Sequence, residues 1–371
     1  MSHKIHIAHP QLGRAEIEGV RRVLKSGHLR AGALTERFES EFARFVGARF
    51  GIAVNSGTSA LFLTAKALLR PGDEAIVPDF TFVATASMVL AAGARPVFAD
   101  VNEKTFTLEP ADVERRITSR TRAILPVHLY GHPADILALE RLARRHRLHL
   151  IGDAAQAHGA KHQGQDVGSF RDIVCYSFYP TKNLTTAEGG MLVTSNARLA
   201  EKLRLMRSHG ERRRYEHVCL GYNFRLTDVA AAIGLAQLRQ LSEGNRRRRQ
   251  NAAALARGLA GIAGIEIPQE AEGNFHVYNS FTIRLNPNVM GMSRDEFRAR
   301  LAREGIETAV HYPLPLHRQP LFRGYGRDED FPVSTRLAKT VLSLPVHPAL
   351  TAHDLNRIIR VVRNTAGEAV R

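Results

Sequence analysis

IVCYSFYPTKNLTTAEGGMLVT, residues 173–194, contains two apolar runs separated by a segment rich in hydroxyl, glycine and proline residues. The runs at 173–178 and 191–194 are nearly all apolar at successive positions, rather than at alternate ones. Strands that are apolar on both faces are typical of a sheet that helices cover on both sides. This stretch therefore predicts two buried strands with a polar loop between them.

The alternation of short β-rich runs with longer helical patterns continues outward from this stretch. We predict further strands at 51–54, 74–78, 96–100, 122–129 and 148–153, and helices at 58–69, 82–91, 108–117, 133–147 and 197–208. Such alternation predicts an α/β fold with an open, mostly parallel sheet. Because ligand sites of these sheets lie beyond the carboxyl ends of the strands, residues that directly follow a predicted strand are the candidate site residues.

The pattern changes after Thr227, which resembles a helix N-cap. Residues 227–259 are helical almost throughout, in one helix or in two with a break near Gly244. A predicted strand at 280–285 and helices at 294–304, 333–342 and 353–364 follow. We therefore expect a large α/β domain over 1–240 and a smaller C-terminal α+β domain over 241–371.

The composition is that of an ordinary soluble protein. With 44% hydrophobic and 24% charged residues among 371, disordered, collagenous and coiled-coil classes are excluded. The two cysteines, Cys175 and Cys219, offer neither a disulfide framework nor a cysteine-based zinc site, and we expect no metal. No secretory signal is visible, and the longest uncharged stretch, 80–94, is too short to span a bilayer. We expect a soluble, cytoplasmic protein.

The chain is basic, with 52 lysines and arginines against 36 acidic residues and a net charge of +16. This favours anionic partners, including phosphorylated small molecules and nucleic acid. Short arginine clusters occur at 212–214 and 246–249. Both adjoin helix-like sequence, so solvated helix faces are the commoner explanation and nucleic-acid binding is the less expected one.

Three predicted strand ends are followed by residues that suit cofactor chemistry. After 51–54 come Gly57, Thr58 and Ser59, where backbone amides at a helix start would favour a phosphate, or where Ser and Thr only cap the helix. No dinucleotide or P-loop fingerprint is present. Asp153 ends the strand at 148–153 and is either a helix cap or a buried carboxylate that needs a cationic partner.

Lys182 follows the strand at 173–178, among small and hydroxyl residues. A desolvated lysine loses its proton more readily, and a neutral amine can form a Schiff base with a carbonyl group. A phosphate site, a carboxylate and a lysine at three strand ends are what pyridoxal 5'-phosphate (PLP) requires, for its phosphate, its ring nitrogen and its aldehyde.

At this point the sequence resembles the DegT/StrS type of nucleotide-sugar aminotransferases, which are fold-type I PLP enzymes of the aspartate aminotransferase superfamily. The resemblance extends over nearly the whole chain. Its motifs are SGTSAL (56–61), PDFTFVATA (78–86), GARPVFADV (93–101), IGDAAQAHGA (151–160), YSFYPTKNLTTAEGG (176–190), RSHG (207–210), GYNFRLTDVAAAIG (221–234) and HYPLPLHRQP (311–320). It implies a mostly parallel seven-stranded sheet flanked by helices in the large domain.

The resemblance also implies residue roles. Lys182 matches the catalytic lysine that holds PLP as an internal aldimine and moves the proton, and Asp153 matches the acid that pairs with the ring nitrogen. Gln156 matches the residue beside the ring hydroxyl, and Phe82 matches the aromatic residue that stacks on the ring. Thr58, Ser59 and Ser177 match residues that contact the phosphate, and Gly57 matches the glycine that shapes the turn. Asn223 matches a phosphate contact from the neighbouring subunit, which implies a homodimer with shared sites. Substrate contacts correspond to Arg225, which could also serve only the turn before Thr227. They correspond as well to His311, Tyr312 and His317, which could also be loop-packing residues.

The expected activity is a transaminase that moves the amino group of L-glutamate onto C3 or C4 of a nucleotide-diphosphate-linked keto sugar, in amino-sugar or polysaccharide biosynthesis. One alternative is PLP- or PMP-dependent sugar dehydration within the family, but dehydrating relatives can carry histidine at the position of Lys182. A remote alternative is a basic nucleic-acid-binding regulatory protein that keeps the fold.

Overall fold

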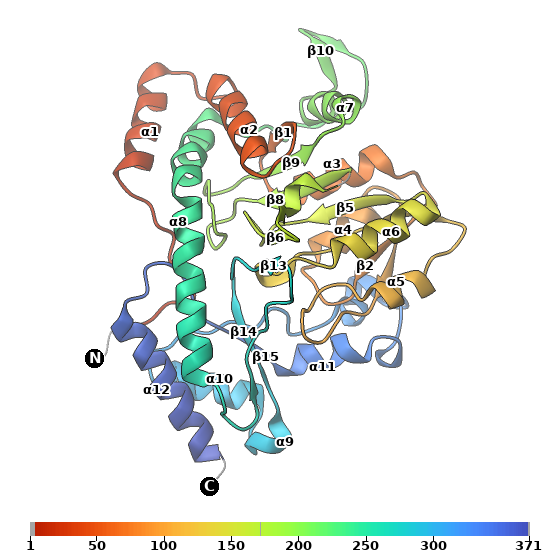
Figure 1. The fold of residues 1–371 in the computed structure, drawn as a ribbon. Helices are drawn as coiled ribbons and strands as arrows, with labels where there is room; N and C mark the ends of the chain where they lie inside the picture. The colour runs from red at the N-terminus through yellow and green to blue at the C-terminus, as the bar shows by residue number, and fades with distance from the viewer. Residues whose placement is uncertain (1–3, 171, 370–371) are drawn as a thin grey trace.

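A seven-stranded sheet with the order β1-β9-β8-β5-β4-β2-β3 lies at the centre of the larger part of the chain (Figure 1). The computed structural model describes residues 4–170 and 172–369. The strands are β1 (Phe50–Val54), β2 (Glu74–Pro78), β3 (Arg95–Ala99), β4 (Thr121–Ile124), β5 (His149–Asp153), β8 (Ile173–Ser177) and β9 (Gly190–Thr194). Pairing is parallel from β8 to β3, whereas β9 is antiparallel to both its neighbours. The mostly parallel α/β sheet is thereby confirmed.

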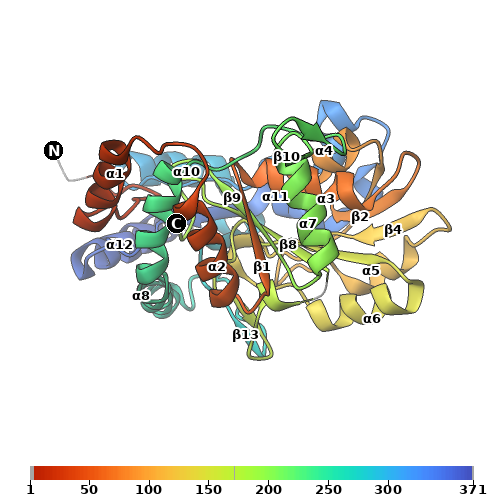
Figure 2. The same cartoon turned by 90° about the horizontal axis from the view of Figure 1, so that it is seen from above.

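Helices cover both faces of the sheet, as Figure 2 shows from above. On one face lie α3 (Gly57–Leu68), α4 (Ala84–Ala91) and α7 (Ala197–Arg207); on the other lie α2 (Ala33–Phe45), α5 (Pro110–Arg115), α6 (Ile136–His146) and the start of α8 (Asp228–Leu259). Successive residues of one strand point to opposite cores: Leu150 packs in the core with α2 and α6, and Ile151 in the core with α3 and α4. This is why the strands are apolar at successive positions.

The helix α8 connects the large sheet to a second core. It is one continuous helix of 32 residues that passes through Gly244 without a break, and Thr227 caps it by accepting the Ala230 N–H at 3.2 Å. Leu241 still packs in the first core, whereas Leu255 packs in the second. The expected domain division after residue 240 falls inside this helix and remains a prediction.

The second core surrounds a three-stranded antiparallel sheet, ordered β12-β14-β15. It consists of β12 (Ile265–Glu266), β14 (Phe281–Leu285) and β15 (Val341–Leu344), with α10 (Arg294–Arg303) and α12 (Ala352–Ala369) packed on it. Ile5 also packs here, and its N–H donates to the Gly305 carbonyl at 2.9 Å. The N-terminal segment therefore returns to the C-terminal unit.

Several boundaries differ from those expected. The strand expected at 122–129 ends at Ile124, shortly before Pro126, which has no N–H to donate to a sheet. The helix expected at 333–342 is α11 (Pro332–Thr340), and the chain then enters β15, where Leu344 pairs with Phe281. Two helices, α1 (Arg14–Ser26) and α2, were not expected at all.

The remaining elements are short. β6 (Lys161–His162), β7 (Gln165–Asp166) and β13 (Asn274–Phe275) form a small sheet, and β10 (Glu211–Arg213) with β11 (Glu216–His217) forms a hairpin that projects from the body in Figure 1. α9 (Pro287–Met290) is a single turn. Among the residues that the structure describes, no helix has the length and apolar character needed to cross a membrane.

Candidate active site

Three loops meet at one edge of the large sheet. β5 and β8 are parallel neighbours, so their last residues, Asp153 and Ser177, lie at the same edge. β1 ends there too, because Val54 pairs with Gly190 and Gly190 pairs with Ser177. The loops that follow β1, β5 and β8 therefore converge where the sequence places the candidate residues.

The loop after β1 turns directly into α3. Ser56 caps this helix by accepting the Ser59 N–H at 3.1 Å, and the Ser59 hydroxyl donates to Oδ1 of Asn55 at 2.7 Å. A Cβ atom on Gly57 would lie 2.6 Å from the Cβ of Ser177, so glycine is needed for close approach to β8. Thr58 is exposed in the first turn. The start of α3, where helix amides favour anions, therefore lies against the end of β8.

Asp153 is a buried residue, with 5% of its surface exposed to solvent. Its Oδ2 accepts a hydrogen bond from the Thr85 hydroxyl at 2.9 Å, and its Oδ1 accepts the Ala155 N–H at 3.1 Å. Burial raises the pKa of Asp153, while these two donors and the charge of Lys182 act in the opposite direction. A buried carboxylate of this kind is stabilised further by a cationic partner.

Lys182 lies in the turn after β8, where its N–H donates to the Tyr179 carbonyl at 2.9 Å. Burial lowers the pKa of its amine to about 8, and the negative charge of Asp153 opposes that shift. The amine consequently loses its proton far more readily than a solvated lysine does. A neutral Nζ at near-neutral pH is what a lysine needs to act as a nucleophile.

Tyr312 and Gln156 connect the C-terminal part of the chain to the same edge. Oε1 of Gln156 accepts the Tyr130 N–H at 2.7 Å, and its Nε2 donates to the Tyr312 hydroxyl at 3.1 Å. The ring of Phe82 is 54% exposed, with its centroid 5.9 Å from that of Tyr312. Burial and the charge of Lys182 lower the pKa of the neighbouring His311 to about 4. His311 is therefore neutral at physiological pH.

Asn223 and Arg225 belong to a segment that borders the end of β1, because the Asn55 N–H donates to the Phe224 carbonyl at 2.9 Å. Asn223 is exposed beside the edge strand, where it pairs with Ser208, and Arg225 pairs with Val54 and donates to the Ser208 hydroxyl at 2.9 Å. His317 contacts two carboxylates instead of Lys182 or Asp153. Their roles in binding remain predictions.

Thr85 and His158 are site-supporting residues that the sequence did not reveal. Nε2 of the fully buried His158 lies 2.9 Å from the Ser177 carbonyl oxygen, and burial lowers its pKa to about 3. Nδ1 of His158 has no hydrogen-bond partner among the described residues. Both residues lie inside motifs already noted, but a single sequence carries no sign that they support a carboxylate and a strand end.

These residues fit PLP. A desolvated amine suits its aldehyde, and a buried carboxylate suits its ring nitrogen. The start of α3 suits its phosphate, and a Cβ atom at residue 57 would obstruct that place. Lys182 would hold the aldehyde, Asp153 the ring nitrogen, and the first turn of α3 the phosphate.

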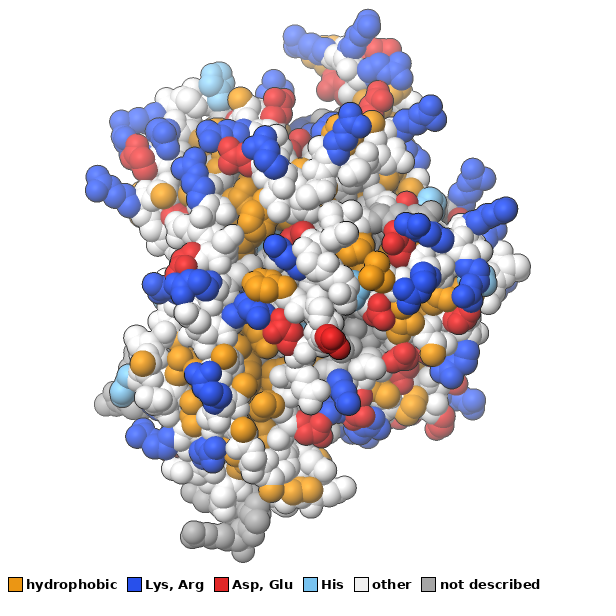
Figure 3. All heavy atoms as spheres, in the orientation of Figure 1, with side chains coloured by type: hydrophobic (Ala, Val, Ile, Leu, Met, Phe, Trp, Pro, Cys, Tyr) orange, Lys and Arg blue, Asp and Glu red, His pale blue; other side chains and the backbone are white. Residues whose placement is uncertain are grey.

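The arginine cluster at 246–249 does not form a uniform basic surface. Arg246 and Arg247 both pair with Glu243, at 2.6 and 3.2 Å, and Arg249 pairs with Glu270 at 2.6 Å, whereas Arg248 is buried. On the face drawn in Figure 3, lysines and arginines are dispersed, with acidic side chains between them. This distribution does not favour a nucleic-acid site on that face.

Comparison with known proteins gives the same assignment. Residues 10–363 match the sequence model of the DegT/DnrJ/EryC1/StrS aminotransferase family. The chain is 43% identical to the UDP-N-acetyl-3-dehydro-alpha-D-glucosamine 3-aminotransferase of Acidithiobacillus ferrooxidans, over 94% of this chain and 93% of that protein.

Two solved structures share the fold. The crystal structure of Streptomyces venezuelae DesV in complex with a ketimine intermediate has a TM-score of 0.91 and 43% identity, and the match covers 95% of this chain and 94% of DesV. The PLP form of Spr1654 from Streptococcus pneumoniae has a TM-score of 0.92 and 27% identity over all of both chains. The fold-type I architecture is thus confirmed, and these similarities imply PLP as the cofactor.

Proposed function

Because the chain belongs to the DegT/DnrJ/EryC1/StrS aminotransferase family, we propose that this aminotransferase acts on a keto group of a nucleotide-diphosphate-linked sugar, with L-glutamate as amino donor. The observation that carries the proposal is that the buried carboxylate of Asp153 and the amine of Lys182, whose pKa is lowered to about 8, follow neighbouring strands at one edge of the sheet. The 43% identity to a UDP-sugar 3-aminotransferase supports a sugar nucleotide as substrate and favours amination at C3 over C4.

Bound PLP would supply an electron sink that stabilises negative charge at the substrate carbon. Lys182 would hold the cofactor covalently through Nζ. With its amine free, Lys182 would take a proton from the carbon that bears the donor amine and deliver it to the carbon that was the cofactor aldehyde. Asp153, held by Thr85 and the Ala155 amide, keeps a proton on the ring nitrogen. The first turn of α3 and the hydroxyls of Thr58, Ser59 and Ser177 bind the phosphate.

Gln156 and Phe82 form two further walls of the cofactor site in this proposal. The Gln156 side chain is oriented by Tyr130 and Tyr312, so its amide is held in one position. Phe82 offers an exposed aromatic face, which suits stacking on a planar ring. Arg225, His311 and Tyr312 are proposed to contact the sugar nucleotide.

The test is an amination screen. Purified enzyme with PLP and L-glutamate is given UDP- and dTDP-linked keto sugars carrying the ketone at C3 or at C4, and products are read by mass spectrometry and NMR. We expect an amino sugar with the amine at C3. Absence of amination on every sugar, with intact PLP binding, would contradict the substrate class.

Dehydration within the family is the second candidate. Lys182 disfavours it, because dehydrating relatives can carry histidine at this position whereas transamination needs a lysine there. The same screen separates the two activities. Dehydration yields a deoxy sugar with no new amino group, whereas transamination consumes glutamate in equal amount to the amino sugar formed.

We also propose a homodimer whose two subunits share each site. Asn223 and the exposed apolar residues Leu220 and Tyr215 lie on or beside the projecting β10–β11 hairpin, which supports contact with a second copy. Mixing a Lys182→Ala variant with an Asn223→Ala variant tests this. Shared sites predict partial recovery of activity in the mixture, and sites built from one chain predict none.

A cytoplasmic location completes the proposal. Both cysteines are free thiols, and Cys219 is exposed, which suits a reducing compartment. Detection of the protein in a cell fraction other than the cytoplasm would contradict this placement.

A further inference from the structure

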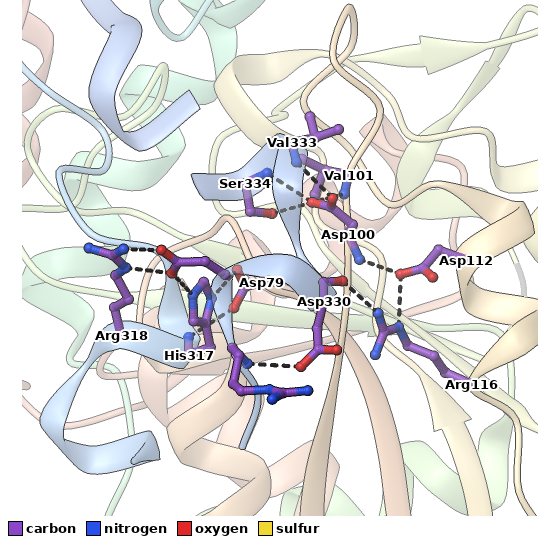
Figure 4. A network of polar contacts seen from close by, with 12 residues as sticks. Asp79, Asp100, Val101, Asp112, Arg116, His317, Arg318, Asp330, Val333 and Ser334 are labelled. Carbon is purple, nitrogen blue, oxygen red and sulfur yellow. Dashed lines mark hydrogen bonds and ion pairs between the residues drawn. The ribbon is translucent and has the colours of Figure 1, made fainter. Parts of the chain in front are cut away.

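His317 lies between two carboxylates just beyond the end of β2. Its Nδ1 is 2.8 Å from Oδ2 of Asp79, and its Nε2 is 2.9 Å from Oδ1 of Asp328. The side chains of His317 and Asp79 are 2% and 0% exposed, and Figure 4 shows the histidine directed at Asp79. Both ring nitrogens face carboxylate oxygens, and an imidazolium, which carries a proton on each nitrogen, donates to both of them.

Backbone hydrogen bonds strengthen the same attachment. Oδ1 of Asp79 accepts the His317 N–H at 2.8 Å, and the Asp79 carbonyl accepts the Leu316 N–H at 2.8 Å. On the other side, Nε of Arg318 donates to Asp328 at 2.6 Å. Residues 316–318 are thus fixed to Asp79, which follows β2 of the large sheet and lies 238 positions before His317.

The segment fixed in this way carries Tyr312. At its other end, the Tyr130 hydroxyl donates to the His311 carbonyl. Between these two attachments, the Tyr312 hydroxyl accepts from Nε2 of Gln156, and its ring lies 6.3 Å from Phe80 and 5.9 Å from Phe82, centroid to centroid. The position of Tyr312 therefore depends on both attachments.

We propose that His317 is a positioning residue: held as a cation between Asp79 and Asp328, it fixes residues 311–318 so that Tyr312 orients the Gln156 amide at the cofactor site. This role replaces direct substrate contact for His317. It rests on the proposed function only in that Gln156 and Phe82 border PLP.

The charges around the ring account for its protonation. Burial alone favours a neutral imidazole, but Asp79 and Asp328 oppose it, and together they raise the pKa of His317. Arg318 neutralises part of the Asp328 charge. Burial raises the pKa of Asp79 and the charge of Asp100 adds to that rise, while His317 opposes it. The ring of Phe331 packs 5.1 Å from the histidine and has the Arg116 guanidinium 4.7 Å from its centroid.

The test is a double-mutant cycle read by equilibrium binding of PLP to the apoprotein, followed by visible absorbance. The variants are His317→Gln, Tyr312→Phe and the double variant, with the exposed His353→Gln as control. We expect His317→Gln to weaken PLP binding roughly tenfold, equivalent to about 1.4 kcal/mol. In the Tyr312→Phe background the same change should add little, because the two residues act as one unit. Additive effects, or binding by His317→Gln equal to that of the control, would overturn the proposal.

Asp328→Asn gives an independent measurement that keeps the buried pair intact. Loss of one carboxylate destabilises the imidazolium, so the pKa of His317 falls. As pH is raised, PLP binding should therefore begin to weaken at a lower pH in the variant than in the wild type. A role limited to folding would lower the thermal unfolding midpoint without moving this pH profile. Coincident profiles would therefore overturn the proposal even if His317→Gln fails to fold.

The outcomes also separate this inference from the proposed function. A wild-type protein that binds PLP but aminates no sugar would refute the substrate class and leave the cycle valid. Active wild type together with unaltered PLP binding in His317→Gln and an unmoved profile in Asp328→Asn would refute the positioning role alone.

Discussion

Thr85 and Asp153 are joined by a 2.9 Å hydrogen bond, from the threonine hydroxyl to Oδ2 of the carboxylate, across 68 positions of the chain. The contact links the start of α4 to the end of β5, and it is one of two donors that stabilise a carboxylate inside the protein. In the proposed mechanism the ionised form of Asp153 would hold a proton on the PLP ring nitrogen, and Thr85 would support that role through its hydrogen bond to the carboxylate.

Thr85→Val is expected to weaken PLP binding roughly tenfold, because leaving a buried acceptor without its donor costs about 1–3 kcal/mol. The measurement is a PLP titration of the apoprotein. Thr365→Val is the matched control, since Thr365 is also buried and its hydroxyl donates to the Val361 carbonyl at 2.8 Å, in the second core. Equal PLP affinity in Thr85→Val and the control would contradict the role of Thr85.

The rate at which apoprotein captures PLP should rise with pH through about 8, because only the neutral Lys182 amine attacks the aldehyde and its pKa is lowered to about 8. Stopped-flow absorbance on both sides of that pH measures the midpoint. In Asp153→Asn the midpoint should move to lower pH, since the lost carboxylate had raised the pKa of the lysine. A midpoint near the ordinary lysine value would show that Lys182 is not desolvated.

Gly57→Ala should impair PLP binding, because the added Cβ would lie 2.6 Å from the Ser177 Cβ and would push the start of α3 away from β8. Gly244→Ala is the comparison, since the nearest atom to its added Cβ is 3.9 Å away and the position is inside α8. That change should leave PLP binding intact and stabilise the fold by about 0.5–1 kcal/mol. Unaltered PLP affinity in Gly57→Ala would argue against a phosphate at this helix start.

Protonation of buried histidines should destabilise the protein at acid pH. Burial lowers the pKa of His128 to about 3, lowers that of His132 to about 4, and lowers that of His276 well below its usual value. The unfolded chain therefore binds protons at these positions that the folded chain does not. The stability contributed by these three histidines is complete above about pH 6.5 and is lost as pH decreases toward 4, by up to about 1.4 kcal/mol per pH unit for each histidine.

Urea unfolding at pH 7 and pH 5 measures this slope. In His128→Asn the fall in unfolding free energy between pH 7 and pH 5 should be smaller by the contribution of one histidine. Equal slopes in wild type and His128→Asn would contradict the account.

The central sheet and the catalytic pair could be predicted because local patterns determine them. Asp153 and Lys182 both follow strands that are apolar at successive positions, and the edge rule for parallel sheets then brings them together. The N-cap at Thr227 was visible for the same reason, since its hydroxyl acts on the next turn of the chain.

The missed features depend on contacts between distant segments. Val341 and Leu342 fall inside the helix expected at 333–342, but they begin β15 because β14 pairs with them. The sequence does not indicate special roles for Thr85 and Asp79. Their partners, Asp153 and His317, come next to them only in the folded chain. The structure likewise places His317 against carboxylates, which no spacing in the sequence indicates.

Covalent attachment of PLP to Lys182 is the claim on which the account depends most. The direct measurement is borohydride reduction of the PLP-loaded protein, followed by proteolysis and mass spectrometry, with Lys182→Ala in parallel. The account predicts a pyridoxyl group on Lys182 in the wild type and neither label nor turnover in the variant. A label on another lysine, or turnover near the wild-type rate in Lys182→Ala, would contradict it.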